Sequence, residues 1–211
     1  SSVIIPLSSN TFMNYYCCMA KLHFYYSTMN AGKSTLLLQA NHNYRSSGLE
    51  TLLFIPEETK KISNQKIVSR IGLSFDALVA DKNFNFLDFY KKKKTKKLSC
   101  VLVDEAQFLK KNQVRQLSQI ADIHNCPVMC YGIRTDFKGE LFEGSKELLA
   151  ISDNLIELKT ICTMCTRKAT MVIRIDKNGN PITEGKKIKV GGNESYQSVC
   201  RKHFRELTKL I

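Results

Sequence analysis

Three consecutive residues, Gly32, Lys33 and Ser34, are of the types that bind phosphate groups in proteins. They end a segment with the spacing of a phosphate loop, although Ser27 stands where the pattern has its first glycine. In such a loop, backbone N–H groups and the positive end of a helix bind anionic oxygens. The lysine reaches the outer phosphates, and the serine ligates Mg²⁺. The pattern therefore predicts that ATP is bound by Ser27, Thr28, Met29, Asn30, Ala31, Gly32, Lys33 and Ser34. The alternative is a chance match at an ordinary helix start.

Two carboxylates, Asp104 and Glu105, come directly after an apolar run at 98–103 that is typical of a buried strand. In phosphate-loop enzymes, a strand neighbouring the phosphate-binding strand delivers an aspartate to the Mg²⁺ sphere. We expect Asp104 in that role, and we expect Glu105 beside the γ-phosphate, where it can accept a proton from an attacking hydroxyl or water. The alternative is a pair of solvated acids at a strand end. The predicted ATP site is completed by Asp104, Glu105, Ala106 and Gln107.

A third set of residues has the spacing of metal ligands. Cys162 and Cys165 form a C-x₂-C pair, and Cys200 and His203 form a C-x₂-H pair after 34 intervening residues. Each pair can sit on a tight turn that directs both side chains at one ion, and two such turns give the tetrahedral shell of structural Zn²⁺. The alternative is three free thiols and one surface histidine.

The elements that must position these residues alternate along the chain. Apolar runs at 21–26, 51–55, 98–103, 127–133 and 155–161 predict strands, and amphipathic runs at 34–44, 84–90 and 112–124 predict helices. This alternation is typical of a mostly parallel sheet covered on both faces. After residue 162 the pattern changes to a hairpin, with strands expected at 171–176 and 187–190, and to a final helix from about Ser198.

The predicted organisation has three parts. Residues 1–18 form an uncharged leader that we expect to be poorly ordered, residues 19–161 form an α/β nucleotide-binding domain, and residues 162–211 form a zinc-binding domain. No stretch approaches the length of a membrane span, so no membrane partner is expected. Cys100, Cys126 and Cys130 lie in or beside apolar runs and fit buried thiols, and a reducing cytoplasm is the compartment expected.

The net charge of +13 arises from 32 basic and 19 acidic residues among 211. Such a balance raises the possibility of a nucleic-acid partner. The excess is mostly lysine, however, and much of it lies in the run 91–97, which has no aromatic residues to stack on bases. A solvated lysine-rich loop is therefore the favoured interpretation, and we expect no nucleic-acid partner.

The order of these motifs resembles the thymidine kinases of the bacterial and human-cytosolic type over 19–206. The matching stretches are 24–34, 69–74, 101–108, 130–142 and 191–196, followed by Cys200. The resemblance implies a RecA-like phosphate-loop NTPase domain and a small C-terminal zinc-ribbon domain that carries a lasso-like loop, here about 176–196. The resemblance also accounts for Ser27 in place of the first glycine of the phosphate loop, because bacterial members tolerate serine there.

The resemblance also implies an activity, in which the γ-phosphate of ATP, bound with Mg²⁺, passes to the 5′-hydroxyl of thymidine or deoxyuridine. By position, Glu105 matches the catalytic proton acceptor and Asp104 the Mg²⁺-associated acid. The nucleoside site matches Met29, Phe108, Ile133, Phe137, Phe142, Gly191, Gly192 and Tyr196. Family members form homotetramers in the cytoplasm and are inhibited by thymidine triphosphate, so both properties are expected here by resemblance.

One segment departs from the family pattern. Where the family carries Asp-x-Arg after the second strand, this chain reads Pro-Glu-Glu-Thr-Lys-Lys at 56–61. Glu58 and Lys60 can substitute, or Arg70 can take over the charge, although lysine does not reproduce the planar fork of arginine. The competing hypothesis is a zinc-ribbon ATPase that binds nucleic acid. The acidic motif at 104–107 is also similar to that of helicases, but the chain has no room for a second motor domain.

Overall fold

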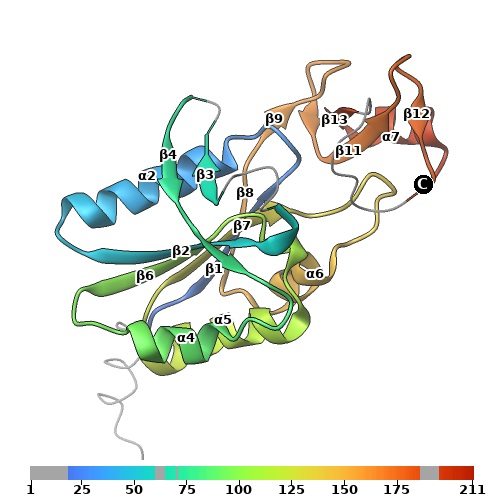
Figure 1. The fold of residues 1–211 in the computed structure, drawn as a ribbon. Helices are drawn as coiled ribbons and strands as arrows, with labels where there is room; N and C mark the ends of the chain where they lie inside the picture. The colour runs from blue at the N-terminus through green and yellow to red at the C-terminus, as the bar shows by residue number, and fades with distance from the viewer. Residues whose placement is uncertain (1–18, 60–64, 70, 186–194) are drawn as a thin grey trace, which may run out of the picture.

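A six-stranded parallel sheet forms the centre of the molecule (Figure 1). The computed structural model describes residues 19–59, 65–69, 71–185 and 195–211, so the predicted leader lies outside the described residues. Along the sheet the strands are β5 (Leu78–Ala80), β2 (Glu50–Pro56), β6 (Leu98–Val103), β7 (Val128–Ile133), β1 (Leu22–Ser27) and β8 (Asn154–Glu157).

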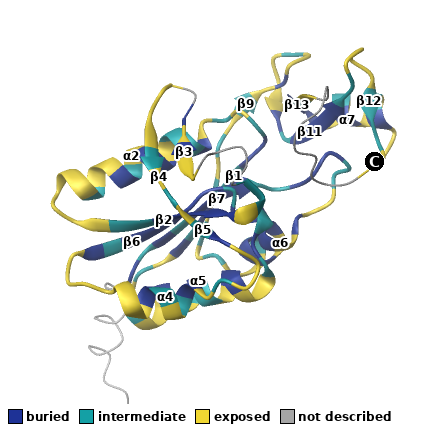
Figure 2. Ribbon diagram, in the orientation of Figure 1, coloured by how far each residue is buried: buried dark blue, intermediate teal, exposed yellow. Residues whose placement is uncertain are grey.

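Helices cover both faces of this sheet, as the sequence predicts. Helix α2 (Lys33–Ser46) packs on one face, and α4 (Phe86–Lys93), α5 (Lys111–His124) and α6 (Glu143–Ile151) lie on the other (Figure 1). Strand β6 shows why its sequence is apolar throughout. Cys100 and Leu102 pack in the cluster on the α2 side, whereas Val101 and Val103 pack in the cluster on the α5 side. The strands at the centre are accordingly buried along most of their length (Figure 2).

The strand order corrects the expectation that the strand before Asp104 neighbours the phosphate-binding strand. Strand β6, which ends before Asp104, does not neighbour β1, because β7 pairs in parallel with both strands and lies between them. The two strands still point the same way, so their carboxyl ends meet at one edge of the sheet. The aspartate and the phosphate loop therefore remain close, across one intervening strand.

Two predicted elements have different bounds in the structure. The run at 155–161 is two strands, because β8 ends at Glu157 and β9 (Thr160–Ile161) pairs instead with β10 (Lys168–Ala169) in a second sheet. The final helix, α7, spans Arg201–Thr208 and does not begin at Ser198, because Ser198 is still paired with Val172 in a sheet. Helix α6 and the hairpin of β3 (Lys66–Val68) and β4 (Ser74–Asp76) were not predicted.

The C-terminal part has its own antiparallel sheet, with β11 (Met171–Ile175) between β12 (Pro181–Ile182) and β13 (Ser195–Val199). The second strand predicted for this hairpin, 187–190, lies outside the described residues. A separate apolar cluster holds this part together: Cys162, Ala169, Met171, Ile173, Val199, Cys200 and Phe204.

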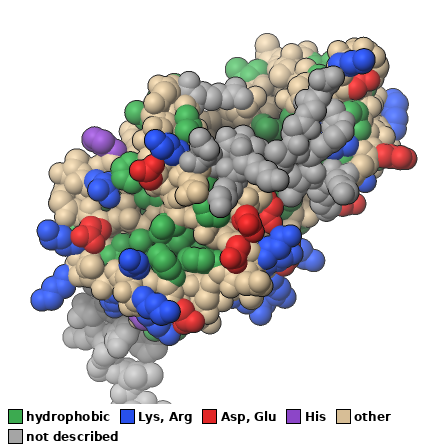
Figure 3. Space-filling model, in the orientation of Figure 1, with side chains coloured by type: hydrophobic (Ala, Val, Ile, Leu, Met, Phe, Trp, Pro, Cys, Tyr) green, Lys and Arg blue, Asp and Glu red, His purple; other side chains and the backbone are tan. Residues whose placement is uncertain are grey.

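The lysine run 91–97 is exposed along its whole length, and its first three residues form the last turn of α4, where positive charge complements the helix dipole. Figure 3 shows the basic side chains of one face spread among acidic ones. Both observations fit the solvated interpretation of the run. Among the described helices, none has the combination of length and apolar character that a membrane span needs.

Candidate active site

The phosphate loop turns from β1 into α2 as the sequence predicts. Gly32 has a φ of 79°, a left-handed conformation that favours glycine, and α2 begins at the next residue. The Lys33 side chain is buried, and its ammonium donates hydrogen bonds to the Thr28 carbonyl at 2.8 Å and the Ser27 hydroxyl at 3.0 Å. Burial lowers the pKa of Lys33, whereas the charges of Glu105 and Asp104 act to raise it. Ser27 thus has a structural role in the place of the first glycine.

Asp104 lies within hydrogen-bond distance of the loop. Its Oδ2 accepts from the Ser34 hydroxyl at 2.8 Å, and its Oδ1 accepts from the Glu105 backbone N–H at 3.0 Å. Burial, and then the negative charge of Glu105, raise the pKa of Asp104 to about 7, although the Ser34 bond and the charge of Lys33 oppose the rise. A serine hydroxyl and a carboxylate side by side are hard oxygen ligands, so this pair fits Mg²⁺.

Glu105 is held by the turn that follows it. Its φ of 50° is left-handed, and the short 3₁₀ helix η1 (Ala106–Phe108) begins directly after it. The Gln107 side-chain amide N–H donates to the Glu105 carboxylate, while the side-chain Oε1 of Gln107 accepts from the Ile133 backbone N–H at 3.2 Å. Gln107 is almost fully buried. It therefore fixes one oxygen of Glu105 relative to the end of β7.

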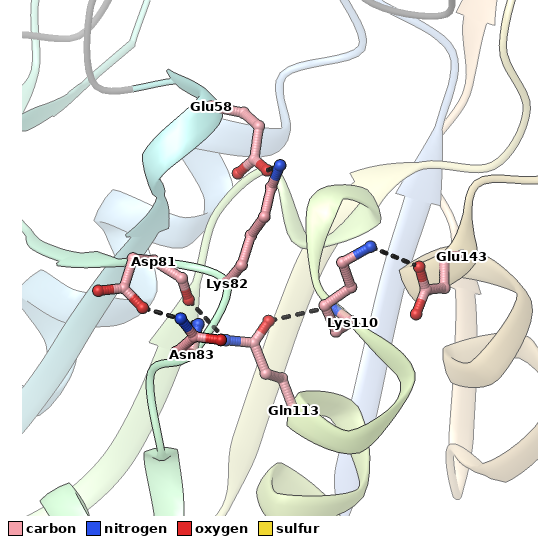
Figure 4. A network of polar contacts seen from close by, with 7 residues as sticks. All are labelled: Glu58, Asp81, Lys82, Asn83, Lys110, Gln113 and Glu143. Carbon is pink, nitrogen blue, oxygen red and sulfur yellow. Dashed lines mark hydrogen bonds and ion pairs between the residues drawn. The ribbon is translucent and has the colours of Figure 1, made fainter.

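A network of polar contacts holds the chain that leaves η1 (Figure 4). The Lys110 backbone N–H donates to the side-chain Oε1 of Gln113 at 3.0 Å. The Lys110 ammonium pairs with Glu143 of α6 at 3.0 Å. The Gln113 amide donates to the carbonyls of Asp81 and Phe84. Two helices and a loop thus fix the segment that positions Glu105 and Phe108.

One cavity of about 640 Å³ contains both halves of the predicted site. Its lining includes most of the predicted residues: Met29, Asn30, Ala31, Gly32, Lys33, Ser34, Asp104, Glu105, Gln107, Phe108, Ile133, Phe137, Phe142 and Tyr196. The rings of Phe108 and Phe142 meet edge to face, with centroids 5.6 Å apart. Ser27, Thr28 and Ala106 lie behind the lining and are buried, and Gly191 and Gly192 lie outside the described residues.

Arg174 contacts this cavity indirectly, and the sequence analysis missed it. Its guanidinium lies 3.9 Å from the centroid of the Phe137 ring and donates to the Glu184 carbonyl at 2.6 Å. Both Arg174 and Phe137 are buried. The arginine therefore joins Glu184, within the predicted lasso, to an aromatic wall of the cavity. A single arginine in the otherwise apolar strand 171–175 is the signal that could have revealed it.

The segment at 56–61, which differs from the family pattern, also reaches the cavity. Glu58 lines it and lies 3.9 Å from the ammonium of Lys82 (Figure 4). Lys60, Lys61 and Arg70 lie outside the described residues. Whether they replace the family's arginine therefore stays a prediction.

The predicted metal ligands converge. Single ligand atoms of Cys162, Cys165, Cys200 and His203 all lie within 4.8 Å of one another. His203 Nδ1 lies 3.3 Å from the Cys162 sulfur and 3.5 Å from the Cys200 sulfur. Burial acts to raise the pKa of Cys162, but hydrogen bonds from His203 and from backbone N–H groups lower it to about 6. Three sulfurs and one imidazole nitrogen, with a thiolate favoured, fit tetrahedral Zn²⁺.

Fold and site together define a phosphate-loop nucleotide-binding protein with a Cys/His cluster in its C-terminal part that fits Zn²⁺. The family model described as thymidine kinase matches residues 20–204, so the chain belongs to the thymidine kinase family. A thymidine kinase from Rhodopirellula baltica is 53% identical over 189 residues, which cover 89% of each chain. Another from Coxiella burnetii is 55% identical over 189 residues, which cover 89% of this chain and 96% of the relative.

Among solved structures, the Pif1 helicase from Candida albicans aligns with 75% of this chain and 40% of its own, at 14% identity and a TM-score of 0.41. That likeness is too low to bear on function. The family membership favours the kinase interpretation over the nucleic-acid ATPase.

Proposed function

We propose that this protein transfers the γ-phosphate of ATP to the 5′-hydroxyl of thymidine, and of deoxyuridine, to give the nucleoside monophosphate and ADP. The observation that carries the proposal is the position of Glu105. It lines the same cavity as Lys33 and Ser34, and also as the aromatic residues Phe108 and Phe142. One cavity thus combines a carboxylate with the phosphate-loop residues and with apolar aromatic residues, which supports the proposal.

At the phosphate end, the loop would bind the ATP phosphates. The Lys33 ammonium is held by Ser27 and Thr28 at the start of α2, where it can neutralise charge on the outer phosphates. Ser34 and Asp104 would hold Mg²⁺, which when bound neutralises negative charge on the phosphates. Phosphoryl transfer depends mainly on this positioning and charge stabilisation.

Glu105 would act as the general base. Its carboxylate accepts the proton of the 5′-hydroxyl while that oxygen bonds to the γ-phosphorus, and the bond from the γ-phosphorus to the ADP oxygen breaks. Gln107 occupies one carboxylate oxygen as a donor, which orients the other oxygen without removing its ability to accept a proton. We therefore assign catalysis to Glu105 and its positioning to Gln107.

At the apolar end, Phe108, Ile133, Phe137, Phe142 and Tyr196 would enclose the base and sugar, with Met29 at the boundary to the phosphate loop. An apolar aromatic cavity suits a neutral pyrimidine, and a few backbone groups can then read its edge. A single methyl group changes binding by only about 1–3 kcal/mol, so deoxyuridine should also be accepted.

Further properties belong to the same proposal. We propose that residues 19–161 form the nucleotide-binding domain and that residues 162–211 form the zinc-binding lasso domain, in which Gly191 and Gly192 contribute to the nucleoside site. We also propose a structural Zn²⁺, a homotetramer, feedback inhibition by thymidine triphosphate and a cytoplasmic location. Family membership supports these features.

The test is a nucleoside panel. Purified protein is mixed with ATP, Mg²⁺ and each nucleoside in turn, and the monophosphate is measured by chromatography. We expect thymidine and deoxyuridine monophosphates to form well ahead of cytidine or purine products. Equal rates for all nucleosides, or no product while ATP still binds, would contradict the proposal.

A further inference from the structure

A second cavity, of about 680 Å³, lies in the C-terminal part of the molecule and has a strongly basic lining. Its basic residues come from three separate segments: Arg134 after β7, Arg167 and Lys168 around β10, and Arg201, Lys202 and Arg205 of α7. Glu206 is the one acidic residue among the lining residues. We call this cavity the basic groove.

The groove is enriched in arginine beyond what the composition predicts. The chain has 24 lysines but only 8 arginines, and four of those eight line this one cavity. The planar guanidinium presents paired donors that match phosphate oxygens, whereas lysine acts as a point charge. In a chain whose positive charge is mostly lysine, four arginines around one groove are a feature of the groove and not of the bulk charge.

The positive charges of the groove are poorly neutralised by the protein. Among the described residues, no acidic side chain pairs with these four arginines, and Glu206 pairs with Lys202 at 3.7 Å. Arg205 donates to the Ile211 backbone oxygen at 3.0 Å, and Arg134 donates to the Thr170 carbonyl at 3.2 Å. Beside the groove, Lys159 lowers the pKa of Lys168, whereas the charge of Glu157 acts to raise it. Crowding like charges is unfavourable, so an anion would relieve it.

The groove and the active-site cavity lie back to back. Along the chain after β7, Ile133 and Thr135 line the active site, and Arg134, between them, lines the groove. In β11, Met171 lines the groove and the next residue, Val172, lines the active site. Successive side chains of extended backbone point to opposite sides, so one wall separates two cavities. The groove is therefore distinct from the phosphate loop.

We propose that the basic groove is a second anion site that binds an oligophosphate group. No aromatic residue lines it, so recognition falls on phosphate oxygens and not on a stacked base. This inference does not depend on the proposed kinase activity, because it concerns a different cavity.

Calorimetric titration of the full chain with inorganic tripolyphosphate tests the proposal. The phosphate loop also binds this probe, so Lys33→Ala is used to disable that loop. In the Lys33→Ala background we compare two charge-matched triple variants. One is Arg167→Ala with Arg201→Ala and Arg205→Ala in the groove. The other replaces Lys91, Lys92 and Lys93 of α4 with alanine. We expect two sites in the wild type and one in Lys33→Ala.

The groove triple should weaken the remaining site at least about tenfold, the equivalent of one lost charge-assisted pair, while the α4 triple stays within about twofold. Because the groove triple could fail to fold, its zinc content and melting temperature are measured. The corresponding Arg-to-Lys triple, which keeps the charge, should show intermediate affinity. Equal weakening by both alanine triples, or a single site in the wild type, would overturn the proposal.

Two further titrations, with a nucleoside triphosphate and with a single-stranded oligonucleotide, identify the source of the oligophosphate. A nucleoside triphosphate that binds as tightly as tripolyphosphate supports a free nucleotide as the ligand. Tripolyphosphate that binds more tightly than the nucleotide supports an inorganic one. Binding of a single-stranded oligonucleotide alone, with affinity falling steeply in salt, would overturn the proposal in favour of a nucleic-acid surface.

Discussion

The Ser198 hydroxyl donates a 2.7 Å hydrogen bond to the Met29 carbonyl, joining the C-terminal sheet to the phosphate loop across 169 positions of sequence. Ser198 is buried, and its own carbonyl accepts from the Thr163 backbone N–H at 3.0 Å. Thr163 lies between the metal-ligand candidates Cys162 and Cys165. The turn that carries the metal-ligand candidates is therefore linked to the phosphate loop through Ser198.

Ser198→Ala should weaken ATP binding. The substitution removes the 2.7 Å bond and leaves the Met29 carbonyl with only the longer 3.4 Å bond from the Thr28 hydroxyl, which costs about 1 kcal/mol at the phosphate loop. We expect the KM for ATP to rise several-fold with a smaller change in kcat, and Ser198→Thr to restore it. Steady-state kinetics are the measurement, with Ser195→Ala, an exposed position of the same strand, as control. An unchanged KM for ATP would show that the bond is only structural.

Glu105→Gln should abolish phosphoryl transfer while ATP still binds. An amide keeps the acceptor for Gln107 but cannot take up a proton, so kcat should fall by at least about 10²-fold, the contribution usual for a general base. Rates are measured by monophosphate formation and ATP binding by calorimetry. Glu157→Gln, an exposed acid on β8, is the matched control. Turnover at the wild-type rate would exclude Glu105 as the base.

Asp104 should make the ligand-free protein less stable as pH rises. Its pKa of about 7 in the folded protein lies above the usual value of about 3.9 for an aspartate, so its contribution is fully present below about pH 4 and is lost as pH rises through 7. One pKa unit is about 1.4 kcal/mol, so Asp104→Asn should be the more stable at pH 8 by on the order of a few kcal/mol. Urea unfolding of both proteins at pH 5 and pH 8, without Mg²⁺ or ATP, measures the difference. A difference that does not change with pH would contradict the shift.

Much of the site could be predicted because each motif is local. Gly32 and Lys33 lie at the start of a helix after a strand, and Asp104 directly follows another strand, so type and spacing are sufficient to place them. What the sequence could not supply are contacts between distant segments. The placement of β7 between β1 and β6, the Ser198 bond to Met29 and the stacking of Arg174 on Phe137 all depend on tertiary packing. Helix α6 was missed because glycine at its second position, Gly144, is a poor helix former.

Zinc removal should destabilise the C-terminal part. We expect about one Zn²⁺ per chain, as four ligands close one tetrahedral site, and Cys165→Ser should lose it. Metal content by atomic absorption and the melting temperature are measured for both proteins. Cys126→Ser, which alters a buried thiol outside the cluster, should lower stability but keep the metal. Equal zinc in Cys165→Ser and wild type would refute the assignment.

Gly144→Ala should destabilise the protein, although alanine is the better helix former by about 1 kcal/mol. Gly144 lies in the first turn of α6, and a Cβ there would lie 2.3 Å from the Ala106 carbonyl oxygen and 3.0 Å from that of Gln107. These are backbone atoms of η1, so α6 and η1 must separate. Overpacking of this kind costs on the order of 1–3 kcal/mol.

Because η1 carries Gln107 and Phe108, the displacement should also raise the KM for thymidine and lower kcat. Urea unfolding and steady-state kinetics on the same samples measure both effects. Lys146→Ala, an exposed change in the same helix, should stay within about 0.5 kcal/mol of the wild type. If Gly144→Ala proved as stable and as active as Lys146→Ala, the close packing of α6 on η1 would not be what positions the catalytic turn.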